Sequence, residues 1–96
     1  MVKSAGKRLG LVAGQLRSWY YEGKRPPNYR HGNCSIYMAY LLDVPYQEIG
    51  SWATMEIKID AKYPNFLDAL LGPHGWAVLQ VYIIQRPERE KQNESA

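Results

Sequence analysis

The apolar positions in the first half of the chain recur every three or four residues, which is the spacing of an amphipathic helix. This pattern predicts a first helix over residues 5–21 that ends near Glu22–Gly23, because glycine is favoured just past a helix terminus. Its apolar stripe consists of Leu9, Val12, Leu16 and Trp19 or Tyr20. The same spacing returns over residues 34–52 and breaks at Asp43–Val44–Pro45. The second pattern predicts a helix, a tight turn and a short further helix.

The spacing of the apolar positions changes in the second half of the chain. Residues 55–59 alternate between apolar and charged, which predicts a strand with one buried and one wet face. Residues 64–71 lie between prolines and predict a short helix. Residues 76–84 are apolar on both faces and rich in β-branched side chains, which predicts a buried strand with Val81 in the middle of the fold. The predicted fold class is therefore α+β, with N-terminal helices followed by strand, helix and strand in a small sheet. Two strands alone are marginal, so a further strand or a homodimer partner is expected to complete the sheet.

Length and composition predict one soluble domain. The chain has 96 residues, of which 46% are hydrophobic and 22% charged, as in ordinary globular proteins. We expect a compact domain at residues 1–85 and a disordered polar tail at 86–96, where no large apolar residue can anchor the chain. The longest strongly apolar stretch is about half the length of a membrane-spanning helix. A single cysteine suits a reducing compartment, so we expect a cytoplasmic protein with no membrane partner.

Positive charge is concentrated at the N-terminal end. Residues 1–33 hold seven basic residues and one acidic residue, a net charge of +6, whereas the remainder of the chain has a net charge of −3. A one-sided basic segment favours an anionic partner. A solvated basic arm is the alternative interpretation.

Two segments resemble the helix-turn-helix of small repressor-type DNA-binding proteins. The first matches at Ala39, Asp43–Val44, Ile49 and Trp52. The second matches at Gly10–Leu11, Leu16 and Trp19, and is followed by Glu22–Gly23–Lys24–Arg25–Pro26, which resembles the segment after the recognition helix. The resemblance implies DNA binding through the later helix of each pair. The first segment departs from the pattern because its reading helix would offer no basic side chain, and a helical hairpin that only builds the core is the alternative.

Cys34, at the start of a predicted helix, is the candidate for nucleophilic chemistry, since a helix N-terminus favours the reactive thiolate. The segments that are similar to small papain-like-fold proteins are Asn33–Cys34, Pro45–Tyr46–Gln47–Glu48–Ile49 and Gly75–Trp76. Such enzymes need a histidine from a later strand, oriented by Asn or Asp. The only later histidine is His74, in a predicted turn. We therefore expect Cys34 to be a packing residue and predict no catalytic residue.

The sequence predicts neither a metal site nor a cofactor. His31, Cys34 and His74 are not at recognised metal-ligand spacing. The glycine-containing segment 10–14 lacks the Lys-Ser/Thr that follows a phosphate-binding loop.

Aromatic and basic residues are interleaved between residues 15 and 30. Tyrosine and tryptophan can stack on bases while arginine and lysine neutralise phosphates, although the same residue types also dominate protein-binding hot spots. The predicted nucleic-acid or partner-binding residues are Gln15, Arg17, Trp19, Tyr20, Tyr21, Lys24, Arg25, Tyr29 and Arg30. Some of these rings could instead belong to the core.

The function that this pattern favours is that of a small non-enzymatic regulatory or accessory protein. It would bind nucleic acid or a nucleoprotein complex through the basic-aromatic segment. The alternative is a phage or mobile-element protein that inhibits or modulates a host protein by direct binding, and a remnant of a papain-like cysteine hydrolase is the third hypothesis. Binding to DNA or RNA that weakens steeply with salt would separate the first hypothesis from the second.

Overall fold

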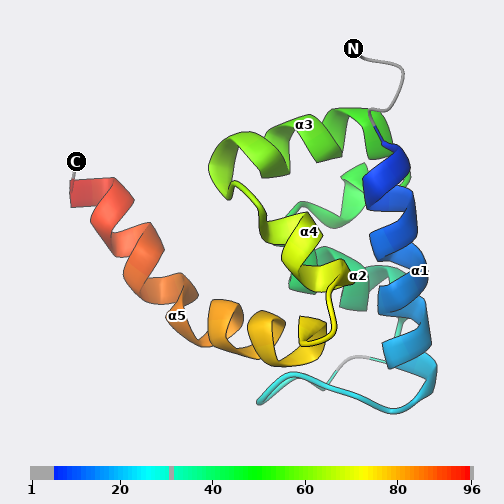
Figure 1. Cartoon of the computed structure of the whole chain (residues 1–96). Helices are drawn as coiled ribbons and strands as arrows, with labels where there is room; N and C mark the ends of the chain where they lie inside the picture. Colours follow the sequence, from blue (N-terminus) through cyan, green and yellow to red (C-terminus); the bar gives the residue numbers. More distant parts are fainter. Residues whose placement is uncertain (1–5, 31, 96) are drawn as a thin grey trace.

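The computed structural model describes residues 6–30 and 32–95, with side chains through Arg86. Its elements, in chain order, are α1 (Lys7–Tyr21), α2 (Cys34–Leu42), the short 3₁₀ helix η2 (Tyr46–Glu48), α3 (Trp52–Lys62), α4 (Phe66–Leu71) and α5 (Gly75–Ser95). Helix α1 contacts α2, α3 and α4, and α5 begins against α4. Figure 1 shows α5 then leading away from the other helices.

The core lies where the inner face of α1 meets the next three helices. Leu9, Val12 and Leu16 on α1 are fully buried, which confirms the apolar stripe that the sequence predicts. The side chains that α2, α3 and α4 bring to the same cluster include Tyr37, Leu41, Met55, Ile59, Leu67 and Leu70. Helix α1 is therefore the element around which the fold is assembled.

The predicted end of the first helix is confirmed. Gly23 adopts a left-handed backbone conformation, with φ of 84°. Its amide donates to the carbonyl of Tyr20, and the Lys24 amide donates to the carbonyl of Trp19. These two bonds form a Schellman motif, in which the last carbonyls of a helix are satisfied by the residues that leave it.

The predicted α+β fold class is wrong, since the described residues contain no strand. Residues 55–59, predicted as a strand, lie within α3. Met55, Glu56 and Ile59 are buried, whereas Ile57 is 57% exposed. Burial thus follows the helical spacing i, i+1, i+4 instead of the alternation of a strand.

The second predicted strand, residues 76–84, lies within α5 and is also helical. Leu79, Tyr82 and Ile83 face the core, whereas Val81 is 52% exposed and Ile84 is 65% exposed. The prediction that Val81 lies in the middle of the fold is therefore wrong. By periodicity alone, a short apolar run fits a buried strand and a helix equally well. Here the segment is helical, and α5 packs against α4.

Of the remaining sequence predictions, the structure confirms one helix and leaves two others as predictions. The short helix predicted at residues 64–71 is confirmed as α4. Helix α1 continues without a turn through residues 10–14, and residues 43–51, with η2 among them, separate α2 from α3. The resemblance to helix-turn-helix proteins stays a prediction. So does the boundary between a compact domain at 1–85 and a disordered tail.

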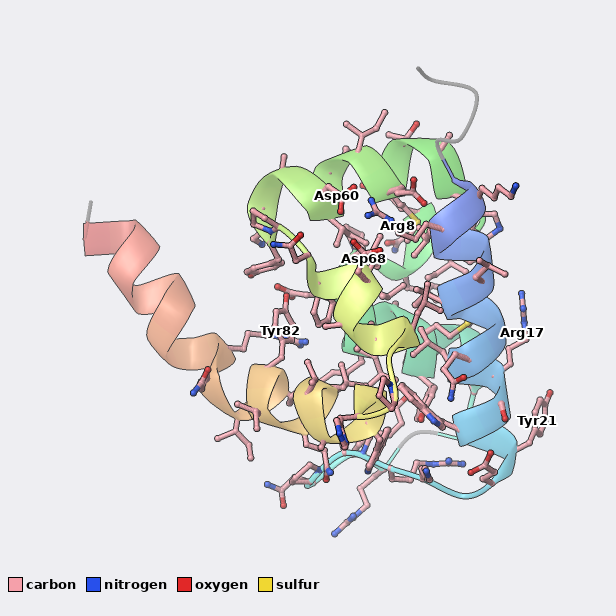
Figure 2. All side chains as sticks on the ribbon, viewed as in Figure 1. Arg8, Arg17, Tyr21, Asp60, Asp68 and Tyr82 are labelled. Atoms are coloured by element: carbon pink, nitrogen blue, oxygen red, sulfur yellow. The ribbon has the colours of Figure 1, made fainter. Side chains whose placement is uncertain are left out.

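A charged cluster ties α1 to α3 and α4. Figure 2 shows Arg8 pointing toward Asp60 and Asp68, with which it forms ion pairs. Burial lowers the pKa of Arg8, but the carboxylates outweigh burial and hold it above its ordinary value. Beside this cluster, the buried Glu56 accepts a hydrogen bond of 2.6 Å from the Leu9 amide. The carboxylate satisfies one of the amides that the first turn of a helix leaves without an intrahelical partner.

No helix in the described part of the chain combines the length and the apolar character needed to cross a bilayer.

Candidate nucleic-acid interface

The outer face of α1 carries two of the predicted binding residues in full exposure. Arg17 and Tyr21 are four residues apart, so they are neighbours on the helix surface. Figure 2 shows both side chains pointing away from the body of the protein. Tyr21 is 78% exposed, and α1 contains no acidic residue. This face therefore offers a cation and an aromatic ring side by side.

Trp19 and Tyr29 are core residues. They are only 5% and 6% exposed. The ring of Trp19 packs edge-on against Trp76 with 5.2 Å between ring centroids, and Tyr29 packs against Tyr37 at 5.7 Å. Burial raises the pKa of the Tyr29 hydroxyl. These two predicted binding residues hold the domain together and present little surface to a partner.

Arg25 and Tyr20 are also engaged within the protein. The Arg25 guanidinium donates to the carbonyls of Tyr20 and Lys24 at 2.9 and 3.1 Å. It also lies over the rings of Tyr20 and Tyr37, at 4.4 and 5.4 Å from their centroids. The Tyr20 hydroxyl donates to the carbonyl of Gly32. Arg25 thus fastens the loop after α1 onto the last turn of that helix, where a cation is favourable.

The remaining predicted residues are more accessible. Arg30 is exposed, and its guanidinium makes a long hydrogen bond of 3.4 Å to the carbonyl of Tyr29. Lys24 is half-buried, with its ammonium 3.7 Å from Glu22. Gln15 is half-buried on α1. The predicted site therefore reduces to three exposed residues and the half-buried Lys24, which together we call the basic surface: Arg17, Tyr21, Lys24 and Arg30.

Among the described side chains of α3 and α5, the cations lie close to carboxylates. Lys58 lies 3.4 Å from Glu48, and Lys62 lies 3.6 Å from Asp43. No ion pair between the described side chains includes Arg17 or Arg30. Among the described side chains, the exposed cations without a carboxylate partner are therefore Lys7, at the start of α1, and Arg17 and Arg30 of the basic surface.

A groove adjoins the basic surface at Arg30. It has a volume of about 700 Å³. Its walls are formed by Asn28, Tyr29, Arg30, Ile36, Ala39, Tyr40, Asp43, Val44, Pro45, Tyr46 and Arg86. The sequence-based prediction missed Tyr40, Tyr46 and Arg86. No local signal could have found them, because the packing of α2, η2 and α5 brings them to the loop.

The other candidates for chemistry are not assembled into a site. Cys34 is half-buried and packs against the core. His31 lies outside the described residues. Among the side chains that are described, no group of three His, Cys, Asp or Glu residues is placed to hold a metal ion.

No protein-family model matches the chain, and neither a curated protein nor a solved structure matches it.

Proposed function

We propose that the protein is a non-enzymatic accessory protein that binds nucleic acid, alone or within a nucleoprotein complex, through the basic surface. The observation that carries this proposal is the exposure of Arg17 and Arg30 without a carboxylate partner among the described side chains, with Tyr21 78% exposed one turn from Arg17.

Such a surface suits a phosphate backbone for two reasons. Each cation that neutralises a phosphate releases condensed counterions, and this release drives binding that is independent of sequence. An exposed tyrosine beside the cations offers a face on which a base can stack. Helix α1 itself contains no acidic residue, and the carboxylate of Glu22, which follows it, lies 3.7 Å from the Lys24 ammonium, which offsets its repulsion of a polyanion.

The test compares two double variants that remove the same amount of charge. Arg17→Gln/Arg30→Gln removes the unpaired cations, whereas Lys58→Gln/Lys62→Gln removes two cations that are paired with carboxylates on other elements. Arg25 is kept, because it fastens the loop to α1.

Affinity for generic DNA and RNA is measured over a range of salt concentrations. The first variant should bind more weakly, with a slope of log K against log[salt] that is shallower by about 1.4 to 1.8, the value for two lost phosphate contacts. The second variant should behave like the wild type. Equal effects of the two variants would show that only net charge matters, and unchanged binding by the first variant would refute the proposal.

A second candidate function, direct binding of a host protein, is favoured by the strip of α1 between Lys7 and Arg17. Leu11 is 61% exposed there. A methyl group added at Gly10 or Gly14 would meet no atom within 4 Å, so the space over these two residues is open. Small residues on one helix face allow a second helix to approach closely. Loss of a partner protein with Leu11→Gln but not with Arg17→Gln/Arg30→Gln would favour this candidate over nucleic acid.

A further inference from the structure

We propose that the groove beside Arg30 receives one unstacked base of a single-stranded nucleic acid, with the adjoining phosphate at the Arg30 guanidinium. This inference rests on the proposed function and specifies the form of nucleic acid that the protein selects.

The groove has the size and the aromatic walls that a base requires. Its volume of about 700 Å³ falls within the range of about 300 to 1,000 Å³ that is typical of small-molecule sites. Tyr40 and Tyr46 line it and are 37% and 50% exposed, so their rings are accessible to a ligand. Flat rings of this kind stack on any base, because every base has a π-face.

Among the described charged residues that line the groove, only Arg30 is not paired with another charged group, so it is the cation that can bind an anion. Arg86 donates to the carbonyls of Tyr40 and Leu41 at 3.0 and 3.3 Å. Its Nε lies 4.0 Å from Asp43, and this carboxylate also lies 3.6 Å from Lys62. Arg86 and Asp43 are thus engaged with each other and with the ends of helices. Arg30 remains exposed at the rim, and it also belongs to the basic surface.

One wall of the groove is held in place before any ligand arrives. The Tyr40 ring packs against Tyr29, with 5.1 Å between centroids, and under the Arg86 guanidinium at 5.3 Å. Tyr29 is itself buried in the core. A base that stacks on Tyr46 and packs beside this ordered wall restricts few further side-chain rotamers, which favours affinity.

Single-stranded nucleic acid fits this site better than a duplex. A base inside a duplex must be unpaired and unstacked before it can enter a pocket, and this step costs least for a strand that is already single. The basic surface would track the phosphates of the same strand, since Arg30 is common to both sites.

The test measures fluorescence anisotropy of labelled ten-nucleotide probes: a single strand, a duplex and a single strand in which all bases are replaced by abasic sites. Wild-type protein should bind the single strand about tenfold more tightly than the abasic strand or the duplex, which is the effect expected for one base on an aromatic ring. Tyr46→Leu should lose this preference, whereas Tyr46→Phe, which keeps the ring, should retain it. The comparison of probes on wild-type protein does not depend on the folding of any variant.

The outcomes separate the groove from the basic surface. Salt-sensitive binding with no preference for the single strand over the duplex or the abasic strand would overturn the groove proposal and leave the proposed function standing. So would a Tyr46→Leu protein that discriminates as well as wild type. If no probe binds at any salt concentration, both proposals fail. If a peptide shifts the NMR signals of the Tyr40 and Tyr46 rings and none of the nucleic-acid probes does, the groove is a protein-binding site and this inference is overturned.

Discussion

Replacing Gly75 by alanine tests how closely α5 approaches α4. Gly75 is the first residue of α5 and is buried. An added methyl group would overlap the carbonyl oxygen of Leu70 and would lie 3.1 Å from the carbonyl carbon of that residue. It would also lie 3.2 Å from the outer edge of the Trp19 ring. Two of these neighbours are backbone atoms, which cannot rotate out of the way as a side chain can.

The expected cost follows from this geometry. Overpacking of a close contact typically destabilises a protein by about 1 to 3 kcal/mol. We therefore expect Gly75→Ala to lower the free energy of unfolding by about 2 kcal/mol. For a domain of this size, this loss corresponds to a fall in Tm of about 8 to 16 °C.

Gly10→Ala is the matched control, because it makes the same chemical change where no atom lies within 4 Å. Alanine is favoured over glycine in a helix interior by about 1 kcal/mol, so this variant should be more stable than wild type. Urea unfolding followed by tryptophan fluorescence measures both, since Trp19 and Trp76 pack together near Gly75. A Gly75→Ala protein as stable as wild type would refute the described contact between α4 and α5.

Three further predictions test the core, the charged cluster and the response to pH. Leu79→Ala should cost about 2 to 5 kcal/mol in urea unfolding because Leu79 is fully buried, whereas the exposed Val81→Asp should change stability by less than about 0.5 kcal/mol. If Val81→Asp cost more than Leu79→Ala, the result would support the buried strand predicted at residues 76–84 and contradict helix α5. Glu56→Ala should cost about 1 to 3 kcal/mol because it leaves the Leu9 amide without its acceptor, and Glu56→Gln, which keeps an acceptor oxygen, should cost less. Burial raises the pKa of Tyr37 and Tyr82, so the unfolded chain loses these protons first as pH rises. These two hydroxyls should therefore leave the free energy of unfolding unchanged below about pH 10 and lower it progressively above that pH. Absorbance at 295 nm and circular dichroism recorded together would contradict this prediction if all eight tyrosines ionised near pH 10 with the helices intact.

The sequence predicts the first half of the fold well, because its signals there are local. The apolar stripe of α1 and the glycine that ends it are set by neighbours within one or two turns. In the second half the helix at residues 64–71 is confirmed, but the two predicted strands are wrong for a physical reason. In α3 the alternation of Met55, Ile57 and Ile59 fits a strand, but Ile57 is left in solvent when the segment folds as a helix. The helical state is selected by what the segment packs against, which short-range periodicity does not contain.

Local sequence patterns likewise predict the candidate site only in part. The sequence identifies the basic-aromatic segment, but it cannot tell an arginine that binds a helix end from one that faces solvent. Arg25 and Arg30 are five residues apart, yet the first lies over two tyrosine rings and the second lines a groove. The groove itself combines residues from the loop after α1, from α2, from residues 43–46 at the start of η2, and from α5. Only tertiary packing brings them together.

The central position of α1 affects the order of events while the chain is being synthesised. Helix α1 is made before α2, α3 and α4, the helices that cover it. The most distant carboxylate of its charged cluster, Asp68, lies 60 residues after Arg8. At about 5 to 20 residues per second, α1 waits roughly 3 to 12 s on the ribosome for that partner. During this interval the apolar face of α1 is without its final cover. In a nascent chain, α2 and α3 can cover part of this helix earlier, but the face that α4 covers stays open to chaperones until α4 has emerged.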